Sequence, residues 1–517
     1  MTYNSFVSTL GFTGDPFAFT DSDREEKLSD YFVPPPYFAG VIGEPKSPEP
    51  SLIFAPRGGG KSAQRRMVEE AGLEEINPFL CINYSNFESM AGSTPSVTDH
   101  LTQLSRLLTL ALLTELDDEP AKILHLDSHD RQVLKASANL LLSTLNVDEF
   151  RAAMSAVKTI GDKSGELWRK YGGIVAAVIA GAMQKIGLTS VQIPSNLLGD
   201  AQEAASSAQY LFAQLAQMSR KLGWLSVYVV IDRVDETDAT SSKPQAAFEL
   251  IRALVTNLTT LEQPGVAFKF FLWDQLRPIA IEAGIRTDRI AEFRLSWSSI
   301  ELAEMLSARL SAYSDGSIES FNDLLMDKGR LDAHLLLAHL CYGSPRDMIR
   351  MAKQIITEAT RASSEIGSIS EAAIWKGVHE FSKMRTSELY SRFQSDLFKF
   401  ADVSFVTNKL ASDVFRISDN AMRQKLQQWT GVGVIRKMTE VSDGKNRPKH
   451  VYTFTDLRVV LARTPLADVQ LVLDNYALKC TNCTKFVIGS DAELVCECNA
   501  RVPLAGSHSL LQEVLIL

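Results

Sequence analysis

The chain has 517 residues, of which 45% are hydrophobic and 22% charged, a balance typical of globular proteins and unlike that of disordered or fibrous chains. This length predicts roughly three to five structural units. The formal net charge of −9 excludes a general attraction to nucleic acid, so a nucleic-acid site would have to be a local basic patch.

An arm is expected over residues 1–50, ahead of the first domain. It contains a short helix at Ser22–Tyr31 and then the sequence V-P-P-P-Y-F at 33–38, which is stiff and extended. Because the arm directly precedes the glycine-rich stretch that follows, we expect it to cover a ligand bound there. Its aromatic side chains either contact the base of that ligand or simply anchor the arm to the core, and anchoring is favoured. These side chains are Tyr31, Phe32, Tyr37 and Phe38.

The stretch Ser51–Arg66, with the sequence SLIFAPRGGGKSAQRR, has the pattern of a phosphate-binding loop. A short apolar strand leads into three glycines, which let backbone N–H groups close on a triphosphate. Lys61 would reach the β- and γ-phosphates, and Ser62 would hold Mg²⁺. A glycine-rich turn before a surface helix is the alternative, which the acidic partner further along the chain disfavours. The expected loop-side contacts with the nucleotide are Pro56, Arg57, Gly58, Gly59, Gly60, Lys61, Ser62 and Ala63.

A helical insertion is predicted at about 95–220, between the loop and its acidic partner. A minimal nucleotide-binding core needs far fewer residues there, so the insertion is interpreted as a structural or partner-contacting subdomain. The longest clean apolar run, 171–183, is shorter than the roughly 20 residues that span a bilayer. A membrane-inserting element is therefore the disfavoured alternative, and no membrane partner is expected.

The acidic partner of the loop is the stretch Trp224–Asp238, WLSVYVVIDRVDETD. Its apolar, β-branched run predicts a central parallel strand that ends at Asp232, where the carboxylate would bind Mg²⁺ through water. Asp235 and Glu236 follow, and either carboxylate could polarise the attacking water, with Glu236 preferred. The alternative, a strand followed by an acidic and solvated turn, is disfavoured by the loop upstream.

Another buried strand is predicted at Val266–Leu272, followed by Asp274, whose side chain is placed to contact the nucleotide and sense its γ-phosphate. Arg286 or Arg289 could act on the nucleotide of a neighbouring subunit, although surface arginines are the favoured interpretation. The predicted fold class is therefore α/β, with a P-loop NTPase parallel sheet in a core domain at 51–298.

Residues 299–385 are predicted to be all-helical and to form a lid. Within them, the sequence G-S-P-R at 343–346 is typical of a helix start, with a turn glycine, a serine cap and a proline at the first position. Arg346 would then be held at the helix N-terminus, where it could point at the γ-phosphate.

Residues 386–465 predict a winged helix, with helices at 405–411 and 418–429 followed by a two-stranded wing. Between residues 416 and 455, eight Lys or Arg residues stand against three Asp or Glu residues, a local basic patch in an acidic chain. Nucleic acid is slightly favoured over a protein as the partner of this patch. The candidate contacts are Arg423, Lys425 and Gln427 on the second helix and Lys445, Arg447 and Lys449 on the wing.

Four of the six cysteines lie in residues 466–517, as C-T-N-C at 480–483 and C-E-C at 496–498. Two close pairs separated by a short strand-like stretch predict a tetrahedral Zn²⁺ site with four thiolate ligands, although the second pair is tighter than usual. Four unligated thiols are the alternative to the zinc site, and zinc is favoured. Disulfides are disfavoured because no secretory leader is seen and a cytoplasmic protein is expected. The four ligands would be Cys480, Cys483, Cys496 and Cys498, which leave no open position for catalysis.

Three motifs resemble those of bacterial ATPases on the initiator or STAND side of the AAA+ group: APRGGGKS at 55–62, VVIDRVDE at 229–236 and GSPR at 343–346. The resemblance covers roughly residues 15–460 and implies an origin-recognition-type ATPase core, a helical lid and a winged helix in sequence. Ala55 stands where the family pattern has its first glycine, and the insertion is far longer than a minimal core requires.

The resemblance also implies residue roles. Lys61 and Ser62 would hold the phosphates and Mg²⁺, Asp232 and Glu236 would serve as metal ligand and base, and Arg346 would be the second sensor. Bacterial ATPases of this kind often act as switch subunits in phage defence or in mobile elements, so these settings are expected for the chain.

The sequence thus predicts a Mg-ATP-dependent molecular switch that couples ATP binding and hydrolysis to self-assembly as a homo-oligomer and to engagement of nucleic acid or an effector protein. ATP, Mg²⁺ and Zn²⁺ are the expected ligands. The alternative is a non-catalytic scaffold with permanently bound nucleotide, whose C-terminal modules dock an effector protein.

Overall fold

The structure is a computed structural model, and it describes residues 2–142, 145–157, 175–190, 203–362, 367–407, 410–441 and 449–516. The chain folds into two compact units. The core unit consists of Asp21–Asp23 and Pro34–Ser296. The C-terminal unit consists of Met1–Thr20, Arg24–Val33 and Trp297–Leu517.

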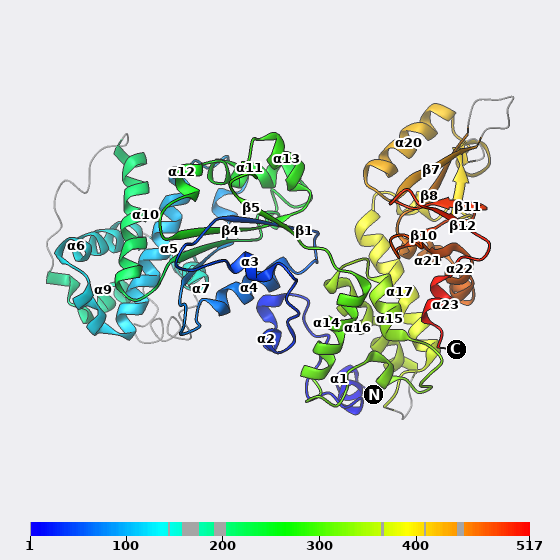
Figure 1. The fold of residues 1–517 in the computed structure, drawn as a ribbon, viewed down its shortest axis with the longest axis horizontal. Coiled ribbons are helices and arrows are strands. Elements are labelled where there is room, and N and C mark those ends of the chain that lie inside the picture. Colours follow the sequence, from blue (N-terminus) through cyan, green and yellow to red (C-terminus); the bar gives the residue numbers. More distant parts are fainter. Residues whose placement is uncertain are drawn as a thin grey trace. The chain divides into compact units, whose positions relative to one another are not determined.

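The core unit is built on a five-stranded sheet in which all neighbouring strands are parallel (Figure 1). The order across the sheet is β2-β3-β4-β1-β5. The strands are β1 Ser51–Ala55, β2 Leu80–Tyr84, β3 Val227–Ile231, β4 Val266–Trp273 and β5 Ala291–Arg294. Strands β3, β4 and β1 are buried along their whole length, as expected for apolar runs inside a parallel sheet. The α/β fold with a parallel sheet that the sequence predicts is therefore confirmed.

Alternate side chains of the strands enter two separate hydrophobic layers. Ile53 of β1 belongs to the smaller layer, together with residues of α3 (Phe38–Ile42) and α4 (Lys61–Ala71). Leu52 and Phe54, whose side chains point to the opposite face of β1, belong to the larger layer. The helix that follows the glycine-rich loop is thus fixed against the sheet by the smaller layer.

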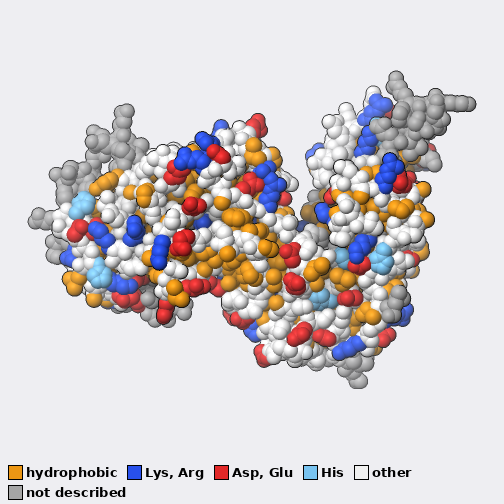
Figure 2. Space-filling model, viewed as in Figure 1, with side chains coloured by type: hydrophobic (Ala, Val, Ile, Leu, Met, Phe, Trp, Pro, Cys, Tyr) orange, Lys and Arg blue, Asp and Glu red, His pale blue; other side chains and the backbone are white. Residues whose placement is uncertain are grey.

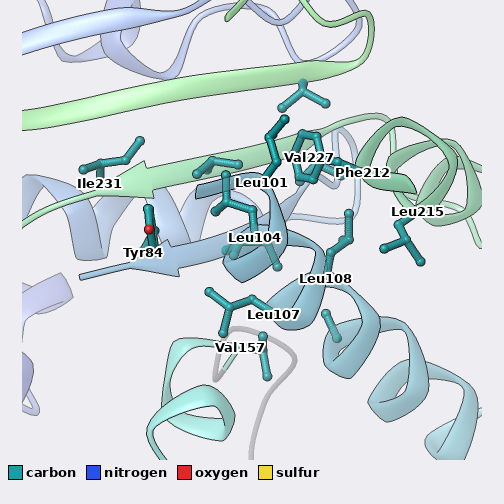
Figure 3. Packing of buried hydrophobic residues seen from close by; sticks show 14 of the residues in the cluster. Tyr84, Leu101, Leu104, Leu107, Leu108, Val157, Phe212, Leu215, Val227 and Ile231 are labelled. Atoms are coloured by element: carbon teal, nitrogen blue, oxygen red, sulfur yellow. The ribbon is translucent and has the colours of Figure 1, made fainter. Parts of the chain in front are cut away.

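The larger layer is formed with long helices of the insertion. Figure 3 shows leucines of α5 (Val97–Asp118) beside Phe212 and Leu215 of α10 (Glu203–Lys221) and beside Val227 of β3. The insertion therefore supplies part of the hydrophobic core of the core unit. The other helices of this unit are α6 Ser128–Ser137, α7 Val147–Ala156, α9 Val175–Lys185, α11 Pro244–Val255, α12 Leu258–Leu261 and α13 Leu276–Glu282. Among the described residues, no helix combines the length and apolar character that a membrane crossing needs.

The C-terminal unit begins with a set of helices in which α2 and α15 pack against α14, and α16 packs against α17. Arg309 of α14 is buried, and its guanidinium donates to the carboxylate of Glu25 and to the hydroxyl of Tyr31. The helices are α1 Tyr3–Thr9, α2 Leu28–Tyr31, α14 Ser299–Ala312, α15 Ala333–Leu340, α16 Pro345–Ala362, α17 Glu371–Tyr390 and α18 Gln394–Leu397.

The single helix predicted at Ser22–Tyr31 is wrong, because the chain forms a short 3-10 turn at Ser22–Arg24 and then α2. The two pieces are held by different partners. Asp23 is bonded within the core unit, whereas Glu25 is buried within the C-terminal unit, where Tyr313 and Arg309 both donate to its carboxylate. These two sets of contacts interrupt the helix.

The region predicted as a winged helix contains α20 (Asp419–Gly431), the hairpin β7 (Ile435–Val441) and β8 (Lys449–Phe454), and α21 (Leu457–Arg463). Strand β6, Ser404–Val406, pairs with the other side of β8. The helix predicted at 405–411 is therefore wrong in its first residues, which are a strand. Phe405 of β6 packs between Phe400, Tyr452 and Phe454, so aromatic packing on the sheet outweighs the local helical pattern.

A small cysteine module, residues 477–503, follows α22 (Val469–Tyr476) and precedes α23 (Leu510–Val514). It consists of two antiparallel pairs of short strands, with β9 bonded to β10 and β11 to β12. The strands are β9 Ala477–Lys479, β10 Phe486–Ile488, β11 Glu493–Val495 and β12 Arg501–Pro503. Arg436 of β7 donates to the carbonyl of Val495 at 2.7 Å, which ties the module to the neighbouring sheet.

Candidate functional site

The glycine-rich loop lies between the end of β1 and the start of α4, at the carboxyl edge of the sheet. Gly58 and Gly60 have φ values of 79° and 98°, a left-handed conformation that residues with a Cβ rarely adopt. The N–H of Gly59 donates to the carbonyl of Pro56 at 3.1 Å, which closes the turn. The loop therefore has the backbone that the sequence pattern requires, and α4 begins at Lys61.

Lys61 is placed at the N-terminus of α4, and its ammonium group lies 3.5 Å from the carbonyl of Ala55. Among the described residues it makes no ion pair. Burial raises the pKa of Asp274, at the end of the neighbouring β4, while the charge of Lys61 lowers it and that of Asp235 raises it further. These three charged groups therefore lie close enough to influence one another at the end of the sheet.

Arg57 and Asp235 join the loop to the segment after β3. The Nε of Arg57 donates to Asp235 Oδ2 at 2.8 Å, and its Nη2 donates to the backbone carbonyl of Asp235, also at 2.8 Å. The guanidinium lies 4.3 Å from the centre of the Trp273 ring, at the end of β4. Arg57 therefore contacts both the segment that follows β3 and the end of β4. Arg57 and Asp235, which were each predicted to belong to the site, bind each other.

Asp232 is buried at the end of β3 and is bonded to α4. Its Oδ2 accepts from Arg65 Nε at 3.2 Å, and its Oδ1 accepts from the backbone N–H of Arg233 at 2.9 Å. Arg65 lies one turn beyond Ser62 and its side chain is only 2% exposed. It also donates to Glu69, at 2.5 Å, and to Asp23. The predicted metal ligand thus lies in a buried cluster of charges.

Burial alone would lower the pKa of Arg65, but the carboxylates of Glu69, Asp232 and Asp23 hold it above its ordinary value. Burial raises the pKa of Glu69, against the opposing charge of Arg65. Asn83, at the end of β2, donates to Glu69 at 2.9 Å. The cluster therefore links the ends of β2 and β3 to the helix that follows the glycine loop.

Glu236 differs from Asp235 in its surroundings. The Glu236 side chain is 53% exposed, whereas that of Asp235 is 5% exposed. Glu236 Oε2 lies 3.6 Å from Nε of Arg233 and lines a cavity of about 440 Å³ together with Asn83 and Thr237. Of the two candidate bases, Glu236 is therefore the one that faces open space.

The arm side chains considered for base contact are engaged in packing. Tyr37 stacks on Phe293 with ring centres 5.3 Å apart, and its hydroxyl accepts from Gln64 Nε2 at 3.3 Å. Tyr31 belongs to the C-terminal unit, where the Arg309 guanidinium lies 4.7 Å from its ring centre. These contacts fit the anchoring interpretation of the arm.

Arg346 is exposed in the first turn of α16, within the C-terminal unit. The predicted helix start is confirmed, because the Ser344 hydroxyl accepts from the N–H of Asp347 at 3.2 Å and Pro345 is the first residue of the helix. Asp347 is buried and accepts from Arg385 at 2.9 Å and from Arg458 at 2.6 Å, which joins α16, α17 and α21.

The candidate arginines of the core unit have local partners: Arg286 pairs with Asp288 and Arg289 with Glu262.

Helix α20 exposes part of its predicted contact surface. Arg423 and Gln427 are exposed, and Figure 2 shows a group of Lys and Arg side chains over this helix. Lys425 instead pairs with Asp396, and its ammonium lies 5.8 Å from the ring centre of Trp429. The predicted wing contacts Lys445 and Arg447 lie outside the described residues.

The four clustered cysteines come together in the cysteine module, with all four Sγ atoms within 4.8 Å of one another. The Sγ atoms of Cys480 and Cys498 are 3.6 Å apart, and those of Cys483 and Cys496 are 3.4 Å apart. Four thiolates at the usual Zn–S distance of about 2.3 Å would be about 3.8 Å apart, so the cluster has the size of a tetrahedral zinc site.

The turns that carry these cysteines have a shared backbone feature. Thr484 and Asn499, each directly after the second cysteine of its pair, have φ values of 62° and 66°. The side-chain N–H of Asn482 donates to Cys498 and lowers the pKa of that thiol to about 6, whereas burial raises the pKa of Cys496 to about 12. A bound divalent metal would deprotonate all four thiols.

Two site residues, Arg65 and Arg233, were not anticipated from the sequence. Arg65 lies three positions after Ser62, a spacing that places both on one face of a helix, and this spacing was the available signal. Arg233 has a left-handed φ of 61°, which no sequence pattern indicates. Both arginines contact carboxylates that the sequence did single out.

Comparisons with known proteins add little to this geometry. No protein-family model matches the sequence, and no curated protein matches it. Among solved structures, the Aeropyrum pernix ORC1 protein in complex with DNA matches with 12% identity and a TM-score of 0.39, over 87% of this chain and 97% of that one. The Aeropyrum pernix ORC2 protein in ADPNP–ADP complexes matches with 10% identity and a TM-score of 0.39, over 86% and 96%. Likeness this weak establishes neither a family nor a function for this chain.

Proposed function

We propose that the chain is a Mg-ATP-dependent molecular switch whose nucleotide site lies at the carboxyl edge of the parallel sheet. The observation that carries the proposal is the joining of the glycine loop and its helix to the acidic segment after β3. Arg57 reaches Asp235 at 2.8 Å, and Arg65 reaches Asp232 at 3.2 Å. The two sequence motifs therefore meet at one place, although 170 or so residues separate them.

The residues present fit a magnesium-bound triphosphate. Lys61, without an ion-pair partner among the described residues, carries a positive charge at a helix N-terminus, which favours phosphate oxygens. Each carboxylate oxygen of Asp232 accepts one bond from the protein, and each can accept another. Ser62 would ligate the metal directly and Asp232 through water. When bound, Mg²⁺ neutralises charge on the phosphates.

Glu236 is the proposed base. Its exposed carboxylate would take a proton from the attacking water as the oxygen of that water bonds to the γ-phosphorus. The bond from the γ-phosphorus to its bridging oxygen then breaks, leaving ADP and phosphate. Asp235 is held by Arg57, so its part would be to fix the loop and not to accept the proton.

The C-terminal unit would pass the nucleotide state on to a partner. The exposed Arg423 and the basic surface over α20 support an anionic ligand such as nucleic acid, and the exposed Arg346 supports a role as a sensor from the lid helices. Self-assembly into a homo-oligomer and an effector protein are further parts of this proposal. The four cysteines would hold a structural Zn²⁺.

The direct test is the substitution Lys61→Ala. Loss of a charge-assisted contact with phosphate should weaken ATP binding at least about 100-fold. The thermal midpoint without nucleotide should stay nearly unchanged, because the hydrogen bond from Lys61 to the carbonyl of Ala55 is long, at 3.5 Å. Titration calorimetry measures the affinity. Lys46→Ala, an exposed lysine ahead of β1, is the matched control. Equal ATP affinity in wild type and Lys61→Ala would refute the proposed site.

A second candidate is a scaffold that binds nucleotide without hydrolysing it. It is favoured by one observation, that both Asp232 and Asp235 are already bound by arginines. Phosphate release by purified protein, with and without added DNA or RNA, separates the two. Release above that of the Lys61→Ala variant supports the switch, and tight binding without release supports the scaffold.

A further inference from the structure

Three residues of the arm, Asp21–Asp23, belong to the core unit, while the chain on both sides of them belongs to the C-terminal unit. We call these three residues the acidic strap. Within the core unit, three arginines hold the strap. Arg65 and Arg66 come from α4, and Arg233 directly follows the predicted metal ligand Asp232.

The contacts of the strap are mostly charged. Asp23 accepts from Arg65 and lies 2.8 Å from Nη2 of Arg233. Asp21 accepts from the same nitrogen of Arg233 at 3.0 Å. The carbonyl of Ser22 accepts from Arg66.

Each of the two arginines that bind Asp23 also contacts another carboxylate of the proposed site, either the metal ligand Asp232 or the base Glu236. Arg65 donates to Asp232 at 3.2 Å, and Nε of Arg233 lies 3.6 Å from Oε2 of Glu236. Asp23 therefore shares the guanidinium of Arg65 with Asp232, and that of Arg233 with Glu236, and in each case the two carboxylates contact different nitrogens. Arg65 is almost fully buried, so water screens its charge only weakly. A change in the charge of one of its carboxylate partners should therefore alter how strongly it binds the others.

We infer that Asp23 is a positioning residue for the metal ion of the nucleotide site, an inference that rests on the proposed Mg-ATP function. Its negative charge offsets part of the combined positive charge of Arg65 and Arg233. Without it, Arg65 would bind Asp232 more strongly, and the site meant for a divalent cation would gain one net positive charge. Both effects weaken Mg²⁺ binding, and neither weakens binding of a metal-free triphosphate.

The placement of the strap would let the C-terminal unit influence Mg²⁺ binding through Asp23. Glu25 and Lys27, just beyond it, are bonded within the C-terminal unit, Glu25 to Arg309 and Lys27 to the carbonyl of Ala312 at 2.7 Å. The chain that carries Asp23 is therefore anchored in both units. A change in the C-terminal unit that withdrew the strap would lower the affinity of the core unit for Mg²⁺.

The test is a Mg²⁺ titration of nucleotide binding, read by the fluorescence of a labelled ATP analogue on the full chain. For Asp23→Asn we expect the half-saturating Mg²⁺ concentration to rise about three- to tenfold, the effect of one partly screened charge. Binding measured in chelator, without Mg²⁺, should be as tight as in wild type or tighter. Asp23→Glu, which keeps the charge, should restore most of the Mg²⁺ affinity. Asp30→Asn, an exposed acid of the same arm, is the control.

The outcomes separate the inference from the function on which it rests. If wild type shows no Mg²⁺-dependent binding at all, the proposed function fails. If wild type shows it and Asp23→Asn gives the same titration, or loses binding equally with and without Mg²⁺, only the inference on Asp23 is overturned. Should Asp23→Asn fail to fold, the Asp21→Asn variant is tested in its place. We expect a smaller rise in its half-saturating Mg²⁺ concentration, because Asp21 contacts Arg233. An unchanged half-saturating Mg²⁺ concentration in this variant would count against the inference.

Discussion

The sheet of the core unit and the cysteine module hold their shapes by different means. The sheet lies between two hydrophobic layers that include α4, α5 and α10, and its charged site sits at one edge. The module has four short strands, and its small hydrophobic cluster includes two of the candidate ligands, Cys480 and Cys496. We expect the site of the first region to depend on the fold, and the fold of the second region to depend on its metal site.

Removal of metal should therefore have the largest effect, and only on the module. Structural zinc sites contribute on the order of 10 kcal/mol to folding, far more than so small a cluster of apolar residues could replace. A chelator, or Cys483→Ser, should abolish the ordered module while ATP binding by the core unit persists. Hydrogen exchange of residues 477–503 and the zinc content per chain measure the two parts. Cys341→Ala, a buried thiol outside the cluster, should keep its zinc.

The opposite result is equally clear. If the module keeps its protection from hydrogen exchange after complete metal removal, its apolar cluster is sufficient to hold the fold. The module would then be stabilised in the same way as the sheet, and the difference between the two regions would not exist.

A change at the edge of the sheet should affect chemistry without affecting folding. Glu236→Gln keeps the size of an exposed side chain, so we expect unchanged stability and ATP affinity. Loss of a general base should lower ATP turnover about 100-fold, or about 2.7 kcal/mol in the barrier. Steady-state phosphate release measures it, with Asp235→Asn as the comparison. Turnover at the wild-type rate would move the role of the base to another group.

Acid should weaken the core unit by a smaller amount. Burial lowers the pKa of His100, on α5, to about 4, and Tyr84 Oη lies 2.9 Å from its Nδ1. Between about pH 6.5 and 4 the unfolded chain binds a proton that the folded chain does not, so stability is full above this window and falls as the pH drops through it. The expected loss is about 2 kcal/mol by pH 5.

This acid sensitivity is tested by measuring the thermal midpoint of the core unit at pH 7 and pH 5, in wild type and in His100→Gln. A smaller difference in the variant is expected, and an equal difference would mean that other groups cause the acid sensitivity.

The same contrast explains what could be predicted from the sequence. Strands β1, β3 and β4 are short apolar runs that end at a glycine loop or an acidic residue, so the local sequence pattern locates each strand. The cysteine pairs and the Gly-Ser-Pro helix start are likewise recognised from the spacing of a few neighbouring residues. Strand β6 was predicted as a helix because its aromatic partners on β8 lie about 50 residues away.

The charged cluster at the edge of the sheet was beyond such reasoning. Arg65 is an ordinary helix residue by sequence, and its burial among Asp23, Glu69 and Asp232 depends on three separate segments of the chain meeting. The mutual pairing of Arg57 and Asp235 likewise joins residues nearly 180 positions apart, so no local pattern shows that these two side chains bind each other.

The most direct test of the account is a structure with Mn²⁺ in place of Mg²⁺ and a slowly hydrolysed ATP analogue. The account predicts a metal peak about 2.1 Å from Ser62 Oγ, joined to Asp232 through water, with the triphosphate along the amides of Gly58–Gly60. A nucleotide bound away from these residues, or a metal that contacts neither Ser62 nor a water on Asp232, would contradict it.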